Sequence, residues 1–139
     1  MAPRLVVDTN TNCTPHIAAL KKRGVTHVGR YYASGAWKRI TRAEAQALSD
    51  AALQIFTVFE DSGDPELSFD RGVHDAQIAL GQAKGIGQPE GTAIYVALEH
   101  LPHGYDASHV PVIKRYVAGL RKVLGGTYRV GVYSDGVVL

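Results

Sequence analysis

The apolar residues of this chain follow two alternating patterns. Short runs rich in Val, Ile, Tyr and Phe are typical of buried β-strands, and they predict strands at residues 4–7, 25–32, 54–59, 92–98 and 128–133. Between them lie longer stretches whose apolar residues recur every three or four positions, as in amphipathic helices. Because the strand-like runs are apolar almost throughout, they favour a parallel sheet covered on both faces.

Four helices are predicted between these strands, the last two at residues 69–84 and 108–124. Helix start and stop residues support them. These signals are Thr14-Pro15 and Gly24, the capping-box pattern from Thr41 to Glu44, Gly85, and Gly125-Gly126. A fifth helix would follow Ser134, and the chain stops at Leu139.

The strict alternation of strands and helices predicts an α/β fold with a parallel sheet in one domain over residues 1–139. Two architectures satisfy it: an open doubly wound sheet, or part of a (β/α)₈ barrel. The glycine-rich segment 81–91 follows a helix and precedes a strand. A phosphate-binding loop needs the reverse order, so this segment argues against a nucleotide-binding open sheet.

Polar residues follow the predicted strands, and in both architectures ligands bind at the carboxyl ends of the strands. In chain order these residues are Asp8, Tyr31 and Tyr32, Glu60 and Asp61, Glu99 and His100, and Tyr133 and Asp135. Four of the five strands therefore place a carboxylate at one edge of the sheet.

A rim of carboxylates suits glycoside hydrolysis, which uses one carboxylic acid as proton donor and a second carboxylate as base or nucleophile. We predict Asp8, Glu60 and Glu99 as the catalytic set. The predicted substrate-binding residues are Tyr31, Tyr32, Asp61, His100, Tyr133 and Asp135. Tyrosines in such a site can stack on sugar rings and bind their hydroxyl groups.

Structural roles compete with these assignments. Asp8 and Asp135 could cap the helices that follow them, and Glu99 could lie in an exposed loop. The acidic loop at residues 60–66 matches no calcium-binding spacing, the six histidines are scattered, and Cys13 has no histidine partner nearby in the sequence. We therefore expect no metal and no cofactor.

Charge and composition narrow the class of partner. The net charge is +2, and the longest basic cluster is Lys21-Lys22-Arg23, which argues against nucleic acid. No apolar run approaches the roughly 18 residues of a membrane span, and the N-terminal residues lack the core of a signal peptide. By default we predict a cytoplasmic location, or a secreted one if the chain is a piece of a larger product. A single cysteine allows no internal disulfide.

A resemblance to a known family spans essentially the whole chain. It is carried by four segments: VDTNTNC, VGRYYAS, GVHDAQIALGQAKGIGQPEGTAIYVALEH and YRVGVYSDG. The chain resembles the glycoside-hydrolase-like domains of domain-of-unknown-function family 1906. These are similar in turn to the family-25 glycoside hydrolases, the lysozyme-type muramidases that cleave peptidoglycan. The most specific part is the block DA…A…A…G-x-P-x-G-T-x-I-Y.

The resemblance implies a TIM-like (β/α) barrel with a carboxylate-lined pocket, an active-site aspartate at Asp8, and Glu99 as the first acid after the fourth strand. In the muramidases this strand carries an acid-x-acid motif whose second acid donates the proton. Here the run is Glu99-His100-Leu101, and leucine cannot donate a proton. Glu60 or Asp61 would then take the second role.

Two hypotheses for the function are favoured. The first is a hydrolase acting on a cell-wall-type (peptidoglycan) glycan, and the second is a non-catalytic carbohydrate-binding module that lacks the second acid. A small-molecule-binding open α/β domain ranks last, because segment 8–12 is not a glycine-rich turn.

The chain of 139 residues is short for a closed barrel. A (β/α)₈ barrel rarely closes in fewer than about 200 residues, and five strands are visible here. We therefore expect an incomplete barrel, truncated at its C-terminus. A missing segment or another copy in a homo-oligomer would cover the open edge, because uncovered strand edges promote aggregation.

Overall fold

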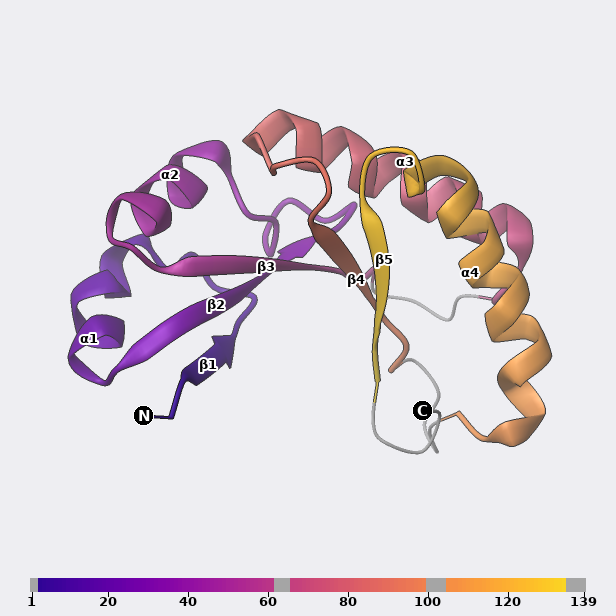
Figure 1. Ribbon diagram of the computed structural model, residues 1–139, viewed down its shortest axis with the longest axis horizontal. Coiled ribbons are helices and arrows are strands. Elements are labelled where there is room, and N and C mark those ends of the chain that lie inside the picture. Colours follow the sequence, from indigo (N-terminus) through magenta and orange to yellow (C-terminus); the bar gives the residue numbers. More distant parts are fainter. Residues whose placement is uncertain (1–2, 62–65, 100–104, 135–139) are drawn as a thin grey trace.

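The computed structural model describes residues 3–61, 66–99 and 105–134. One sheet holds five parallel strands in chain order, so each strand pairs with the next one along the chain (Figure 1). The strands are β1 (Leu5–Asp8), β2 (Val25–Tyr32), β3 (Gln54–Phe59), β4 (Ala93–Ala97) and β5 (Arg129–Tyr133). The predicted α/β class and parallel sheet are confirmed.

The apolar runs locate the strands to within two residues. β2 and β3 have the predicted bounds, β1 runs one residue further to include Asp8, and β4 and β5 begin one residue later than predicted. β1 and β5 each have one strand neighbour among the described residues. What covers their outer edges stays a prediction.

Four helices follow the strands in alternation. They are α1 (Ile17–Lys22), α2 (Arg42–Asp50), α3 (Phe69–Ile86) and α4 (Val110–Leu124). Figure 1 shows them along an arc on one side of the sheet. Helical cover of both faces, suggested by the apolar strands, is thus not found within the described ranges. A barrel explains the pattern equally well, because its inner strand faces are also apolar.

Some helix ends differ from the sequence prediction. α3 continues through Gly85 to Ile86 and ends at Gly87, whose φ of 79° is the left-handed conformation that glycine adopts without strain. At the start of α2, the Thr41 hydroxyl accepts a hydrogen bond from the Glu44 amide at 3.1 Å. The Glu44 carboxylate does not return to Thr41 and is bound elsewhere, as described below.

The main core lies between the sheet and α3 and α4. Tyr32, Phe59 and Ile94, from three neighbouring strands, are at most 2% exposed. They belong to one buried cluster with Tyr116 and Leu120 of α4. Burying each large apolar side chain contributes about 1.5–3 kcal/mol, which fixes the sheet against the helices.

Glycines let α3 and α4 touch through their backbones. A Cβ added at Gly72 would lie 2.1 Å from the carbonyl oxygen of Tyr116, and one at Gly119 would lie 2.1 Å from that of Phe69. Beside this contact the buried carboxylate of Asp75 accepts a hydrogen bond from the Tyr116 hydroxyl at 2.6 Å. The helix pair is therefore joined by both packing and a buried polar contact.

The other face of the sheet carries a second set of aromatic side chains. The Phe56 ring lies over Gly29 and the Tyr95 ring over Gly131, where an added Cβ would come within 2.4 Å of each ring. The two rings meet edge to face with centroids 6.3 Å apart. Tyr95 is 38% exposed, so this face is less covered than the helical side.

Candidate functional site

A pocket of about 380 Å³ opens at the carboxyl ends of β1, β2 and β3. Its lining residues are Asp8, Thr9, Asn10, Tyr31, Trp37, Lys38 and Glu60. Parallel strands bring their carboxyl ends to one edge, so residues far apart in the sequence meet there. Two of the three predicted catalytic carboxylates and one predicted tyrosine thus share a pocket. A larger hollow of about 550 Å³ lies at the opposite ends of β3 and β4, and no carboxylate is among its described lining residues.

Asp8 ends β1, and tyrosine hydroxyls reach both of its carboxylate oxygens. Tyr133, at the end of β5, donates to Oδ2 at 3.0 Å. Tyr31 of β2 donates a longer hydrogen bond to Oδ1 at 3.4 Å. The carboxylate is therefore held in one orientation by side chains from two different strands.

Three carboxylates act on the hydroxyl of Tyr133. Its pKa is raised above the ordinary tyrosine value, first by the hydrogen bond to Asp8 and by burial, and then by the negative charges of Asp8, Glu99 and Glu60. Electrostatic influence falls with distance. The charges of all three predicted catalytic carboxylates thus contribute to the raised pKa of this one tyrosine.

Tyr31 responds to the same charges. Burial raises its pKa well above the ordinary value, and the charges of Asp8 and Glu60 and the neighbouring Tyr133 add to this increase. Both tyrosines consequently keep their protons at neutral pH and act as hydrogen-bond donors.

Lys38 brings a positive charge into this acidic pocket. Its Nζ lies 3.7 Å from Oε1 of Glu60 and 5.5 Å from the centre of the Tyr31 ring. The residue is only 5% exposed, and a lysine so buried normally has a charged or aromatic partner. Here it has both, and its ammonium compensates for part of the negative charge.

Glu99 is the second residue after β4, and its exposed side chain lies outside the pocket lining. The preceding residue, Leu98, donates its amide to the carbonyl oxygen of Tyr133 at 2.8 Å, which joins the ends of β4 and β5. Glu99 thus lies on the rim on the side of Tyr133, while Glu60 lies within the pocket.

The two predicted tyrosines of β2 point in opposite directions, because successive side chains alternate along a strand. Tyr31 faces the pocket, whereas Tyr32 is fully buried on the helical side and donates to Oε1 of Gln88 at 2.6 Å. The prediction that Tyr32 contacts a ligand is therefore corrected: it is a core residue.

Asp61 also has a structural partner. Its two oxygens accept hydrogen bonds from the amide and the hydroxyl of Ser34, both at 2.6 Å. Asp61 fixes the loop after β2 and does not line the pocket of Asp8 and Glu60. The predicted site residues His100 and Asp135, and Leu101 of the strand-four run, lie outside the described residues.

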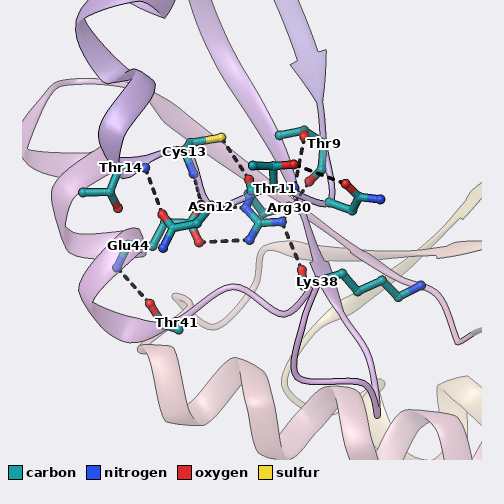
Figure 2. Close-up of polar contacts among 10 residues, drawn as sticks. Thr9, Thr11, Asn12, Cys13, Thr14, Arg30, Lys38, Thr41 and Glu44 are labelled. Carbon is teal, nitrogen blue, oxygen red and sulfur yellow. Dashed lines mark hydrogen bonds and ion pairs between the residues drawn. The ribbon is translucent and has the colours of Figure 1, made fainter.

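A buried ion pair missed by the sequence analysis supports the pocket wall (Figure 2). Arg30 of β2, 1% exposed, binds the Glu44 carboxylate through Nε at 2.6 Å and Nη2 at 3.0 Å. Its Nη1 donates to the carbonyl oxygens of Thr9 and Lys38 at 2.8 and 3.1 Å. The Cys13 amide donates to Glu44 at 2.8 Å. The pair thus ties two wall segments to α2.

One signal could have revealed this pair. Arg30 is the only Asp, Glu, Lys or Arg in the predicted strand 25–32, and a charge buried in a sheet requires a partner. The partner was hidden because Glu44 fits a capping box equally well. Trp37 and Lys38 fall in a segment without apolar periodicity, and nothing in the sequence connects them with Asp8.

The most specific block of the resemblance contributes mainly to the fold. Besides Asp75, it contains Gln82, whose amide forms two hydrogen bonds with the backbone of Ala33, at 3.0 and 2.8 Å. Oε1 of Gln88 accepts hydrogen bonds from the hydroxyls of Tyr32 and Thr57. These side chains hold the end of β2 and the core, and so position the pocket indirectly.

Among residues 3–61, 66–99 and 105–134, no group of three or more His, Cys, Asp or Glu is placed to hold a metal ion. Within the same ranges, every helix is too short or too polar to cross a membrane.

The fold is that of a glycoside hydrolase-like (β/α) domain. Residues 18–139 match the model of the Rv2525c-like, glycoside hydrolase-like domain, and the chain belongs to this family. The predicted resemblance is confirmed at this level, whereas the assignment to family 1906 and the link to family 25 stay predictions.

The chain is similar to longer proteins. It is 30% identical over 143 residues to the uncharacterized protein YbfG of Bacillus subtilis. This alignment covers 91% of the present chain but only 20% of YbfG. The crystal structure of the Tat-secreted protein Rv2525c of Mycobacterium tuberculosis in complex with HEPES is 23% identical, with a TM-score of 0.77, over 91% of this chain and 66% of Rv2525c.

The catalytic domain of an endolysin shares the fold. The catalytic domain of endolysin ply40, from a bacteriophage of Listeria monocytogenes, is 18% identical with a TM-score of 0.61, over 95% of this chain and 63% of that chain. At this identity the likeness shows the fold alone. The five-stranded sheet corresponds to part of each of these longer structures.

Proposed function

We propose that this domain hydrolyses a cell-wall-type glycan, with Asp8, Glu60 and Glu99 as its acid, base and stabilising carboxylates. The observation that carries the proposal is that Asp8 and Glu60 line one pocket at the carboxyl ends of the parallel strands, with Glu99 just after β4 at the same edge of the sheet. Carboxylates gathered on one rim of a parallel sheet are the groups that glycosidic bond cleavage requires.

The contacts suggest a division of roles. Both oxygens of Asp8 are engaged by tyrosine hydroxyls. This carboxylate suits electrostatic stabilisation of the positively charged, oxocarbenium-like transition state. Glu60 and Glu99 take the two other roles, proton donation to the leaving oxygen and attack, either directly on the sugar or through an activated water.

Family membership supports the substrate class. The family is described as glycoside hydrolase-like, and the endolysin domain shares its fold. The pocket volume of about 380 Å³ lies in the usual range for small-ligand sites, about 300–1,000 Å³.

The test is turnover of purified peptidoglycan and of a soluble peptidoglycan oligosaccharide. Glu60→Gln and Glu99→Gln should each lower kcat at least about 100-fold, the usual contribution of an acid–base group. Glu90→Gln is the matched control, because Glu90 is exposed in the turn before β4, at the opposite end of the sheet. Equal activity in all three variants would contradict the proposal.

A second candidate is a glycan-binding domain without catalysis. The observation that favours it is Leu101, which stands where the resemblance implies a second acid. Calorimetric binding of the same oligosaccharide, with no turnover by the unmodified protein, would select this function over hydrolysis.

A further inference from the structure

We propose that Trp37 is a stacking platform for a sugar ring of the ligand, at the mouth of the pocket that holds Asp8 and Glu60. This inference rests on the proposed glycan specificity, although it does not require hydrolysis. Trp37 is 68% exposed and lines the pocket. Single exposed apolar side chains are common on proteins, so its position and support carry the argument.

The loop that carries Trp37 is anchored on both sides. The Ile40 amide donates to the carbonyl oxygen of Tyr31 at 3.0 Å, which ties the loop back to β2. Nη2 of Arg39 donates to the carbonyl oxygen of Ser34 at 2.9 Å, and Ser34 is itself held by Asp61. A ligand therefore meets a loop that is already ordered, which lowers the entropic cost of binding.

The indole is supported from within the protein. Gly35 lies against its edge, since a Cβ added there would come within 3.0 Å of Nε1 of Trp37. The buried Lys38 places its Nζ 5.7 Å from the centre of the indole ring. Cation–π attraction and the glycine contact hold the ring at the pocket while leaving most of it open to solvent.

This combination fits a carbohydrate better than a purely apolar ligand. The electron-rich face of an indole attracts the weakly positive C–H groups on one face of a sugar ring. The carboxylates of Asp8 and Glu60 can then accept hydrogen bonds from sugar hydroxyls. An apolar ligand would displace water from these carboxylates without replacing its hydrogen bonds, which is costly.

Trp37 is the only tryptophan of the chain, so tryptophan fluorescence reports on this position alone. The probe is a soluble tetrasaccharide of alternating N-acetylglucosamine and N-acetylmuramic acid. We expect a saturable change in emission as it binds. Calorimetry should show about tenfold weaker binding for Trp37→Ala, which corresponds to about 1.4 kcal/mol. Trp37→Phe, which keeps an aromatic face, should recover most of the affinity.

Phe69→Ala is the matched control. Phe69 is also partly exposed, with Nζ of Lys122 5.6 Å from its ring centre, but it lies at the start of α3 and outside the pocket lining. Its removal should leave the tetrasaccharide affinity unchanged. Circular dichroism would verify that each variant is folded.

The outcomes separate this inference from the proposed hydrolysis. Suppose that the unmodified protein turns over the glycan with no change in tryptophan emission on binding, and that Trp37→Ala binds with an unchanged Kd. This result would overturn the platform and leave hydrolysis standing. Binding with the expected emission change but no turnover would support the platform and refute hydrolysis. A protein that does not bind the tetrasaccharide at all would overturn the platform.

Discussion

The hydroxyl of Tyr133 on β5 lies 3.0 Å from Oδ2 of Asp8 on β1, although these are the two outer strands of the described sheet. Neighbouring strands are about 4.8 Å apart, so four such spacings along a flat sheet would separate them by roughly 19 Å. The hydrogen bond therefore requires the sheet to curve until its outer strands face one another. That curvature is the geometry of a barrel wall, and it closes the acidic site.

Removal of the Tyr133 hydroxyl should impair turnover more than stability. Tyr133→Phe leaves Asp8 with one tyrosine donor, and a hydrogen bond to a charged group is worth about 1.5–3 kcal/mol. We expect kcat/KM to fall about tenfold or more. Tyr128→Phe is the control, because its hydroxyl binds the Gln88 carbonyl oxygen away from the pocket. Equal kinetics in the two variants would exclude the orienting role of Tyr133.

Breaking the buried Arg30–Glu44 pair should destabilise the whole domain. Glu44→Gln leaves a guanidinium that is 1% exposed without its counter-charge. Loss of one partner of a buried pair typically costs about 3–5 kcal/mol. Urea unfolding at neutral pH measures the effect, with the exposed Gln46→Ala on the same helix expected to change stability by less than about 0.5 kcal/mol. Similar midpoints for both variants would refute the prediction.

Two glycines of α3 should respond oppositely to alanine. Gly72→Ala inserts a methyl group against the backbone of α4 and should cost at least about 1–3 kcal/mol. Gly81 has open space around its Cβ position, so Gly81→Ala should be neutral or stabilise the helix by up to about 1 kcal/mol. Thermal unfolding compares them directly, and a Tm for Gly72→Ala at or above that of Gly81→Ala would contradict the packing described.

Stability should decline in alkaline solution because of buried tyrosines. Burial raises the pKa of Tyr32 well above its ordinary value of about 10. Above pH about 10 the unfolded chain releases this proton while the folded protein retains it, so the free energy of unfolding falls as pH rises. Urea unfolding between pH about 8 and 11 should show a smaller decline for Tyr32→Phe. An identical slope in that variant would show that Tyr32 does not contribute.

Apolar periodicity was sufficient for most of the fold. The apolar runs at β2 and β3 predicted strands with the observed bounds. Helices were also predictable, because a helix continues according to residues close together in the sequence. Helix ends were less predictable: Gly85 tolerates helical geometry, and the left-handed turn comes at Gly87. Parallel topology followed from strict alternation, because each return to the sheet needs a crossover helix.

The order of strands and helices, and the placement of Asp8, Glu60 and Glu99 after strands, could be predicted from local residues, because hydrophobic periodicity and strand direction are local properties. The three-dimensional fold was needed to bring Tyr133 to Asp8. It also turned Tyr31 into the pocket and Tyr32 into the core, and it paired Glu44 with Arg30. These choices depend on the curvature of the sheet, on which face the helices cover, and on the demand that a buried charge find its partner.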